Sequence, residues 1–173
     1  MTRDHADFYV GSISPPALAW LPLFVVFGLL TGCLGAVYNA LLLWFLDHVA
    51  AIRRIPTLAK AAIIGAIIGF AMFVYPLAAG GGDLLTQRIL SGQHIVISAV
   101  IGILAVRFIA GPLSYSAAVP GGIFAPLLAV GALWGLLFDE GFNAVWPGDA
   151  TQLAVPMALI GMAAFFAATV RAS

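Results

Sequence analysis

The chain has 173 residues, of which 63% are hydrophobic and 8% are charged, and its formal net charge is zero. Soluble domains carry about 25% charged residues, so this composition is that of a membrane protein with several spans. A zero net charge also argues against nucleic acid or acidic macromolecules as partners. The single cysteine, Cys33, has no partner for a disulfide within the chain, and we expect it to be a small buried side chain.

The first part of the chain predicts a lead-in followed by two spans. Residues 1–16 are expected to be irregular and outside the membrane, and they do not resemble a cleavable signal peptide. An apolar helix is expected over residues 17–47, which is long enough to cross a bilayer with a tilt, because about 20 residues suffice. A polar connector follows, and a second span is expected over residues 61–75, before a run of three glycines.

The second part of the chain alternates apolar helices with breaks. Residues 83–90 predict a short helix with Asp83 as its N-cap, and a third span follows over residues 93–116. After a Pro-Gly-Gly break, apolar helices are expected over residues 124–138 and 150–170. The predicted fold class is therefore all-α: a polytopic membrane protein with tilted and broken (re-entrant) helices. Irregular backbone is tolerated inside a bilayer only where protein or a water-filled cavity covers it.

Charge distribution predicts the orientation of the spans in the cell membrane. Arg53, Arg54 and Lys60 lie in the connector after the first span, which places that connector in the cytoplasm. The connector over residues 139–149 carries only acidic charges and fits the opposite side. Asp139 and Glu140 could in principle act as paired acids, but a solvated helix end is the favoured interpretation.

Small residues and tryptophans recur in the predicted spans. Three pairs of glycines are spaced four residues apart, which lets helices approach closely in lipid, and we expect them to pack within the chain rather than form a dimer face. The four tryptophans fall near predicted span ends, as interfacial anchors do. These pairs are Gly28 with Gly32, Gly65 with Gly69 and Gly131 with Gly135, and the tryptophans are Trp20, Trp44, Trp134 and Trp146.

The run V-P-G-G-I-F-A-P over residues 119–126 is the strongest candidate for a binding site. Its glycines allow main chain to approach a small ligand, and the helix that follows exposes backbone N–H groups and partial positive charge. No lysine or arginine lies within ten residues, so a bound anion would be held loosely enough to be released. The alternative is a simple break in a kinked span. The predicted anion-binding residues are Gly122, Ile123, Phe124, Ala125 and Pro126.

Residues 119–131 resemble the GxFxP anion-binding motif of the CLC family of chloride channels and proton–chloride exchangers. In that family the motif opens a membrane helix whose N-terminus points at the central anion. Further resemblances follow in the family's order over residues 28–47, 79–82, 105–107 and 161–172, so that the similarity spans roughly residues 21–173.

The resemblance implies that residues 17–173 are a partial CLC-type transmembrane domain, truncated at both ends, similar to most of the second (C-terminal) half. The family's GSGIP-type motif, its gating and proton-transfer glutamates and its late tyrosine have no counterpart here. Only the backbone donors of Ile123 and Phe124 can therefore be assigned from the family.

The function implied by the resemblance is chloride transport, as a channel or a proton-coupled antiporter. The alternative is a non-conducting fragment or structural subunit that needs a separate first half to form a pore. Expected partners are chloride or a similar small anion, the lipid bilayer, and a second copy of the intact protein or the missing half.

Other chemistry has little support in the sequence. No nucleophile–base pair can be assembled, so an enzyme is not expected. The three histidines are isolated, so no metal site is expected, and no cofactor is expected beyond chloride as the transported ion. Arg107, inside an apolar span, is interpreted as a structural residue against helix-end carbonyls, with attraction of anions as the alternative.

Overall fold

The computed structural model describes residues 20–74, 76, 82–91, 95–117, 124–146 and 153–171, without the side chains of residues 83, 84 and 171. The regular elements in these ranges are all helices, which confirms the all-α prediction. They are α1 (Leu21–Ala51), α2 (Thr57–Val74), α3 (Asp83–Leu90), α4 (Ile97–Ser116), α5 (Phe124–Val145) and α6 (Ala154–Arg171). The expected lead-in over residues 1–16 lies outside the described residues.

Helix boundaries differ most from the prediction at the end of α5. The helix was expected to stop at residue 138, but it continues to Val145, so Asp139 and Glu140 are helical rather than part of a polar connector. The two acids are followed by residues that a helix accepts, and proline first occurs at position 147. Helix α3, in contrast, has the bounds that its flanking breakers predict.

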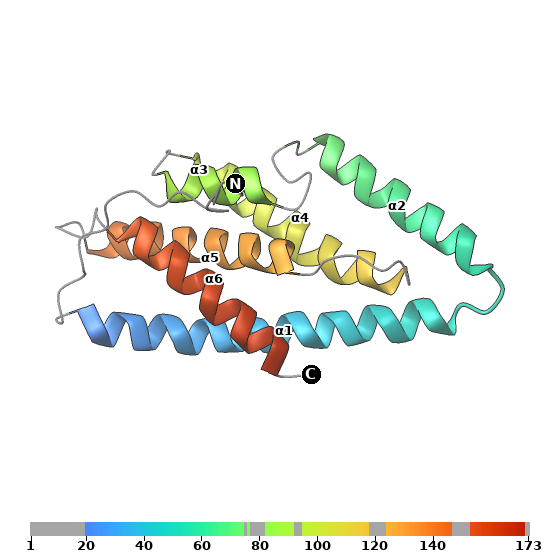
Figure 1. Ribbon diagram of the computed structural model, residues 1–173, viewed down its shortest axis with the longest axis horizontal. Coiled ribbons are helices and arrows are strands. Elements are labelled where there is room, and N and C mark those ends of the chain that lie inside the picture. Colours follow the sequence, from blue (N-terminus) through green and yellow to red (C-terminus); the bar gives the residue numbers. More distant parts are fainter. Residues whose placement is uncertain are drawn as a thin grey trace, which may run out of the picture.

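Helix α1 is the scaffold of the molecule. Its 31 residues make it about 46 Å long, and it runs along the whole bundle in Figure 1, where α6 crosses it obliquely. Helix α2 leans away from the other helices in Figure 1, and Ile64 is its buried residue. Because α1 is longer than the hydrocarbon thickness, it must tilt in a bilayer, as the sequence predicts for this helix.

Helices α5 and α6 pack with their backbones almost in contact. A methyl group placed on Gly131 would meet the carbonyl oxygen of Gly161, and one placed on Gly135 would meet that of Met157. The prediction that glycine pairs pack within the chain is thus confirmed for Gly131 and Gly135. It is wrong for the pairs on α1 and α2, because a β-carbon there would have no atom of the described residues within 4 Å, and those faces point away from the other described helices.

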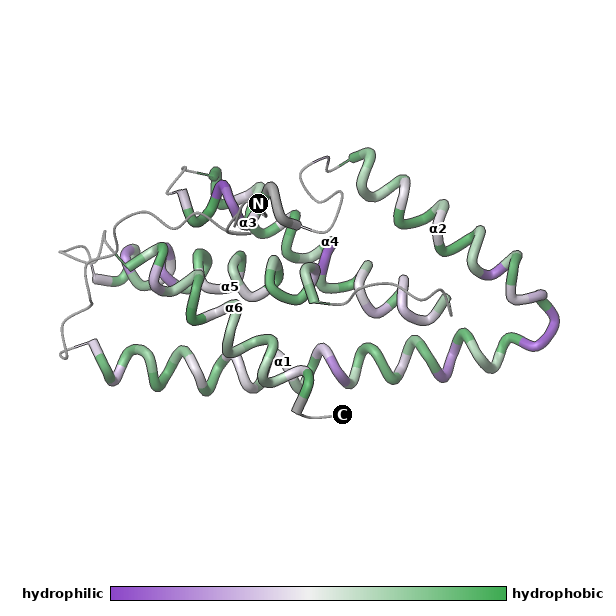
Figure 2. Tube along the Cα trace, viewed as in Figure 1, coloured by the Kyte–Doolittle hydropathy of each residue, from purple (hydrophilic) through white to green (hydrophobic). Residues whose placement is uncertain are grey.

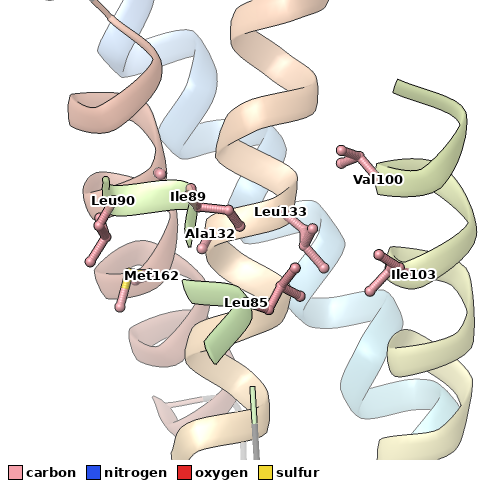
Figure 3. Packing of buried hydrophobic residues seen from close by; sticks show 9 residues of the cluster. Leu85, Ile89, Leu90, Val100, Ile103, Ala132, Leu133 and Met162 are labelled. Atoms are coloured by element: carbon pink, nitrogen blue, oxygen red, sulfur yellow. The ribbon is translucent and has the colours of Figure 1, made fainter. Parts of the chain in front are cut away.

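Buried side chains connect α3 and α4 to the α5–α6 pair. Figure 3 shows side chains of α3 lying against those of α5 and α6, with α4 closing the far side of α5. These residues are Leu85, Ile89, Leu90, Val100, Ile103, Ala132, Leu133, Ala158 and Met162. A short amphipathic helix such as α3 is held mainly by this packing, since helices of eight residues are marginal alone.

The outer surface is apolar, as a lipid-facing surface requires. Helices α1, α2, α4 and α5 are each long and apolar enough to cross a membrane. In Figure 2 hydrophobic residues cover most of the helices, and hydrophilic residues gather at the turn between α1 and α2. Cys33 is exposed, so its predicted burial is wrong. Cys33 is exposed because the neighbouring helices pack against other sides of α1.

Trp134 joins α5 to α1 instead of anchoring a span end. Its indole N–H donates to the hydroxyl of Thr31 at 3.0 Å, and that buried hydroxyl donates to the carbonyl of Phe27 at 2.7 Å. The expectation of an interfacial anchor is therefore wrong at this position.

Replacing Trp134 should weaken the contact between α1 and α5. We expect Trp134→Phe to lower the free energy of unfolding by about 1 kcal/mol, the usual net contribution of one hydrogen bond. Trp146→Phe, at a residue that is 68% exposed, is the matched control and should leave stability unchanged. Denaturant titration of the full-length protein in detergent measures both, and equal effects would contradict an interhelical role for the indole N–H.

Candidate anion site at the start of α5

The structure describes three of the five predicted site residues. Phe124 is the first residue of α5, and Ala125 and Pro126 complete its first turn. The Phe124 side chain is 57% exposed, whereas Ala125 and Pro126 are half-buried, so the start of α5 is accessible on this chain. Gly122 and Ile123 lie outside the described residues.

The first turn of α5 has backbone donors and carries partial positive charge. The first N–H groups of an α-helix have no acceptor in the helix, and the first turn of α5 begins with positions 124–126. Pro126 has no N–H, which leaves the donors of Phe124 and Ala125 among these described positions. The helix dipole adds about half a positive charge at this end, and the first turn contains no acidic residue.

A buried apolar cluster supports the start of α5. The cluster consists of Tyr38, Leu127, Val130 and Phe165, and the Phe124 ring packs edge-on against the Phe166 ring with centroids 5.0 Å apart. Apolar surroundings exclude water and lower the local dielectric, so they strengthen the attraction between backbone dipoles and an anion.

Hydrogen bonds fix the part of α6 that forms this support. The side-chain amide of Asn39 on α1 donates to the carbonyl of Thr169 at 2.9 Å. The buried Thr169 hydroxyl donates in turn to the carbonyl of Phe165 at 2.9 Å. The C-terminal half of α6 is therefore tied to α1 next to the first turn of α5.

Arg107 lies closer to α5 than its distance along the chain suggests. Its side chain is 5% exposed, and a methyl group placed on Gly82 would lie 3.0 Å from its Nη1 and 2.5 Å from Cβ of Ala129. Ala129 is about 7.5 Å along the helix axis from Phe124. The guanidinium thus packs between the start of α3 and the second turn of α5, a placement that no local sequence signal indicates.

The residue before α3 differs from the prediction. Gly82, not Asp83, occupies the N-cap position, and its φ of 103° is in the left-handed region. Glycine adopts this conformation without the steric cost that a β-carbon brings. Any side chain here would also collide with Arg107 or Ala129.

The structure does not bring Asp139 and Glu140 to the anion site. They lie toward the opposite end of α5, and Asp139 is about 22 Å along the helix from Phe124. The expected solvated face is correct for Glu140, which is exposed, and wrong for Asp139, which is 5% exposed.

Comparison with known proteins identifies the family. The family model described as voltage gated chloride channel matches residues 1–173. The chain belongs to the voltage gated chloride channel family. The resemblance noted from the GxFxP motif is therefore confirmed at the level of the family, and the chain is an integral membrane protein with several spans.

Three bacterial relatives in this family are named H(+)/Cl(-) exchange transporter ClcA. The proteins of Vibrio parahaemolyticus and Vibrio campbellii are 35% and 36% identical over 160 residues, which are 91% of this chain and 34% of each relative. That of Salmonella typhimurium is 34% identical over 168 residues, which are 94% of this chain and 35% of the relative. The chain thus spans about a third of the length of these relatives.

Proposed function

We propose that this chain forms part of a chloride pathway across the cell membrane and that the N-terminus of α5 is its anion-binding element. In this proposal the N–H groups of Ile123 and Phe124 donate to the anion, and Gly122, Ala125 and Pro126 shape its approach. The observation that carries the proposal is the first turn of α5, which has free backbone donors, no acidic side chain and a buried apolar support. Membership of the family adds to it.

Such a site would bind chloride through dipoles rather than through a full positive charge. Two N–H groups replace part of the hydration shell of the anion, and apolar side chains keep further water away. Arg107 adds a more distant positive charge beside the second turn of α5. Binding of this kind is weak enough for release, which conduction and exchange both require.

We further propose that the intact protein completes the site with other segments and couples chloride movement to protons. The names of the relatives, proton–chloride exchange transporters, support coupled exchange over a channel. In liposomes that contain the full-length protein, a chloride gradient should then drive protons in the opposite direction. Chloride flux without proton movement would favour a channel.

The anion-binding element can be tested at Ile123. We expect Ile123→Pro to weaken chloride binding about tenfold or more, because it removes an N–H donor, and a hydrogen bond to a charged group contributes about 1.5–3 kcal/mol. Ile123→Val is the matched control, since it keeps the N–H and removes only one methylene group. Calorimetric titration of the full-length protein with chloride measures both affinities.

The outcomes separate backbone from side-chain effects. Equal losses in Ile123→Pro and Ile123→Val would assign the effect to the side chain. A folded Ile123→Pro variant with unchanged chloride affinity would show that the backbone donor is not used.

A further inference from the structure

Asp139 is a buried carboxyl group in the interface between α5 and α6. It follows Gly131 and Gly135 on one face of α5 at intervals of four residues, and those glycines contact Gly161 and then Met157 on α6. The two helices are antiparallel, because the later residue on α5, Gly135, contacts the earlier residue on α6, Met157. Asp139 therefore faces the beginning of α6, and it is 5% exposed.

The hydrogen bonds of Asp139 leave two buried acceptors without a donor. Nδ2 of Asn143 donates to Oδ2 of Asp139 at 3.1 Å. Oδ1 of Asp139 and Oδ1 of Asn143 are both buried, and neither receives a hydrogen bond in the described part of the chain. A buried acceptor without a donor destabilises the fold, and it does so more strongly when it is charged.

In the part of the chain that the structure describes, no cationic side chain is placed to compensate an ionised Asp139 carboxylate. Glu140, its neighbour, is exposed and has the same sign. Residues 21–46 of α1 and residues 154–170 of α6 contain no charged side chain. Arg107 of α4 packs at Ala129, about 15 Å along α5, and Arg88 of α3 is exposed.

Among the described elements, the start of α6 also contributes to the electrostatics at Asp139. A helix N-terminus favours a nearby anion, but by less than the cost of one buried charged acceptor without a donor. Tyr38 and Cys33, the other titratable groups in the middle of α1, lie away from this end, since Tyr38 packs with Leu127 and Val130.

We propose that Asp139 is a proton-binding residue, which takes up a proton from water on Oδ1 and forms a carboxylic acid–amide pair with Asn143. Protonation turns Oδ1 of Asp139 from an acceptor without a donor into a hydroxyl donor. This hydroxyl can then donate to Oδ1 of Asn143, the other buried acceptor of the pair. Glu140 is exposed and charged, and because a charged side chain is costly in lipid, it favours contact of this end of α5 with water, from which the proton comes. The site is remote from Phe124, so this proposal stands independently of the anion site.

Infrared spectroscopy of the full-length protein in detergent tests the proposal directly. As the pH is lowered from mildly alkaline to mildly acidic, we expect a carboxylic acid carbonyl band that shifts in deuterium oxide. The band should be absent in Asp139→Asn and present in Glu140→Gln, the matched control at the exposed neighbour. In Asn143→Leu the band should move to higher frequency, because the acid has lost its amide partner.

Two results would overturn the proposal. One is a band that is unchanged in Asp139→Asn, and the other is a wild-type protein in which no such band forms over this pH range. If Asp139→Asn fails to fold, labelling of wild-type aspartates with ¹³C shows whether an aspartate takes up the proton, and the band shift in Asn143→Leu assigns it to Asp139. A labelled band insensitive to Asn143→Leu would then refute the assignment.

Discussion

Gly135→Ala is expected to destabilise the protein more than any other single-methyl substitution in α5. A β-carbon at this position would lie against the carbonyl oxygen of Met157 and 2.7 Å from Cα of Ala158. These atoms are backbone, so a side-chain rotation cannot relieve the collision and α6 must move. Overpacking of this kind costs about 1–3 kcal/mol, and here it disrupts an interface to which all three apolar clusters around α5 contribute.

Gly141→Ala is the matched control for Gly135→Ala because it makes the same change on the same helix. No atom of the residues that the structure describes lies within 4 Å of a β-carbon at Gly141. Alanine favours a helix over glycine by about 1 kcal/mol, so this control should be neutral or stabilising. Denaturant titration of the two full-length variants measures the difference, and equal stabilities would mean that α5 and α6 are not in close backbone contact.

Gly82→Ala is expected to have the second largest effect, since it combines backbone strain with a collision. A residue with a β-carbon in the left-handed conformation costs about 1–2 kcal/mol. The added methyl would also lie 2.5 Å from Cβ of Ala129 and 3.0 Å from Nη1 of Arg107. The start of α3 should therefore shift away from α5, and Arg107 should shift with it.

A double variant separates the two components at Gly82. Ala129→Gly removes the closest atom. In the double variant Gly82→Ala/Ala129→Gly, the collision with Ala129 should therefore be relieved, whereas the backbone strain at position 82 should remain. In a double-mutant cycle on the free energy of unfolding, we expect a favourable coupling of at least about 0.5 kcal/mol. Strict additivity of the two substitutions would contradict contact between these positions.

Several features of the fold were predictable because their signals are local. The glycine run and the Ser-Gly pair around α3 mark both of its ends, and the predicted bounds agree with the structure. The end of α5 was not predictable from charge, because two adjacent acids look like a polar connector although a helix accepts them. Burial of one acid against α6 is a property of two segments together.

The candidate site shows the same division. The breaker before Phe124 and the missing N–H of Pro126 are visible in the sequence and predict an anion-facing helix end. The residues that support it, among them Tyr38 and Phe165, come from helices far apart in the chain. Their apolar side chains look like those of any other membrane helix, so sequence reasoning did not single them out.

By itself the sequence determined the fold class, the membrane setting, the family motif and the break after which the apolar helix α5 begins. These depend on composition and on short-range backbone preferences. Only the tertiary structure decided which of three similar glycine pairs forms an interface, that Arg107 lies beside α5 and that Asp139 is buried while Glu140 is exposed. The physical reason is that burial and contact arise between helices, and identical local patterns on α1, α2 and α5 meet different neighbours.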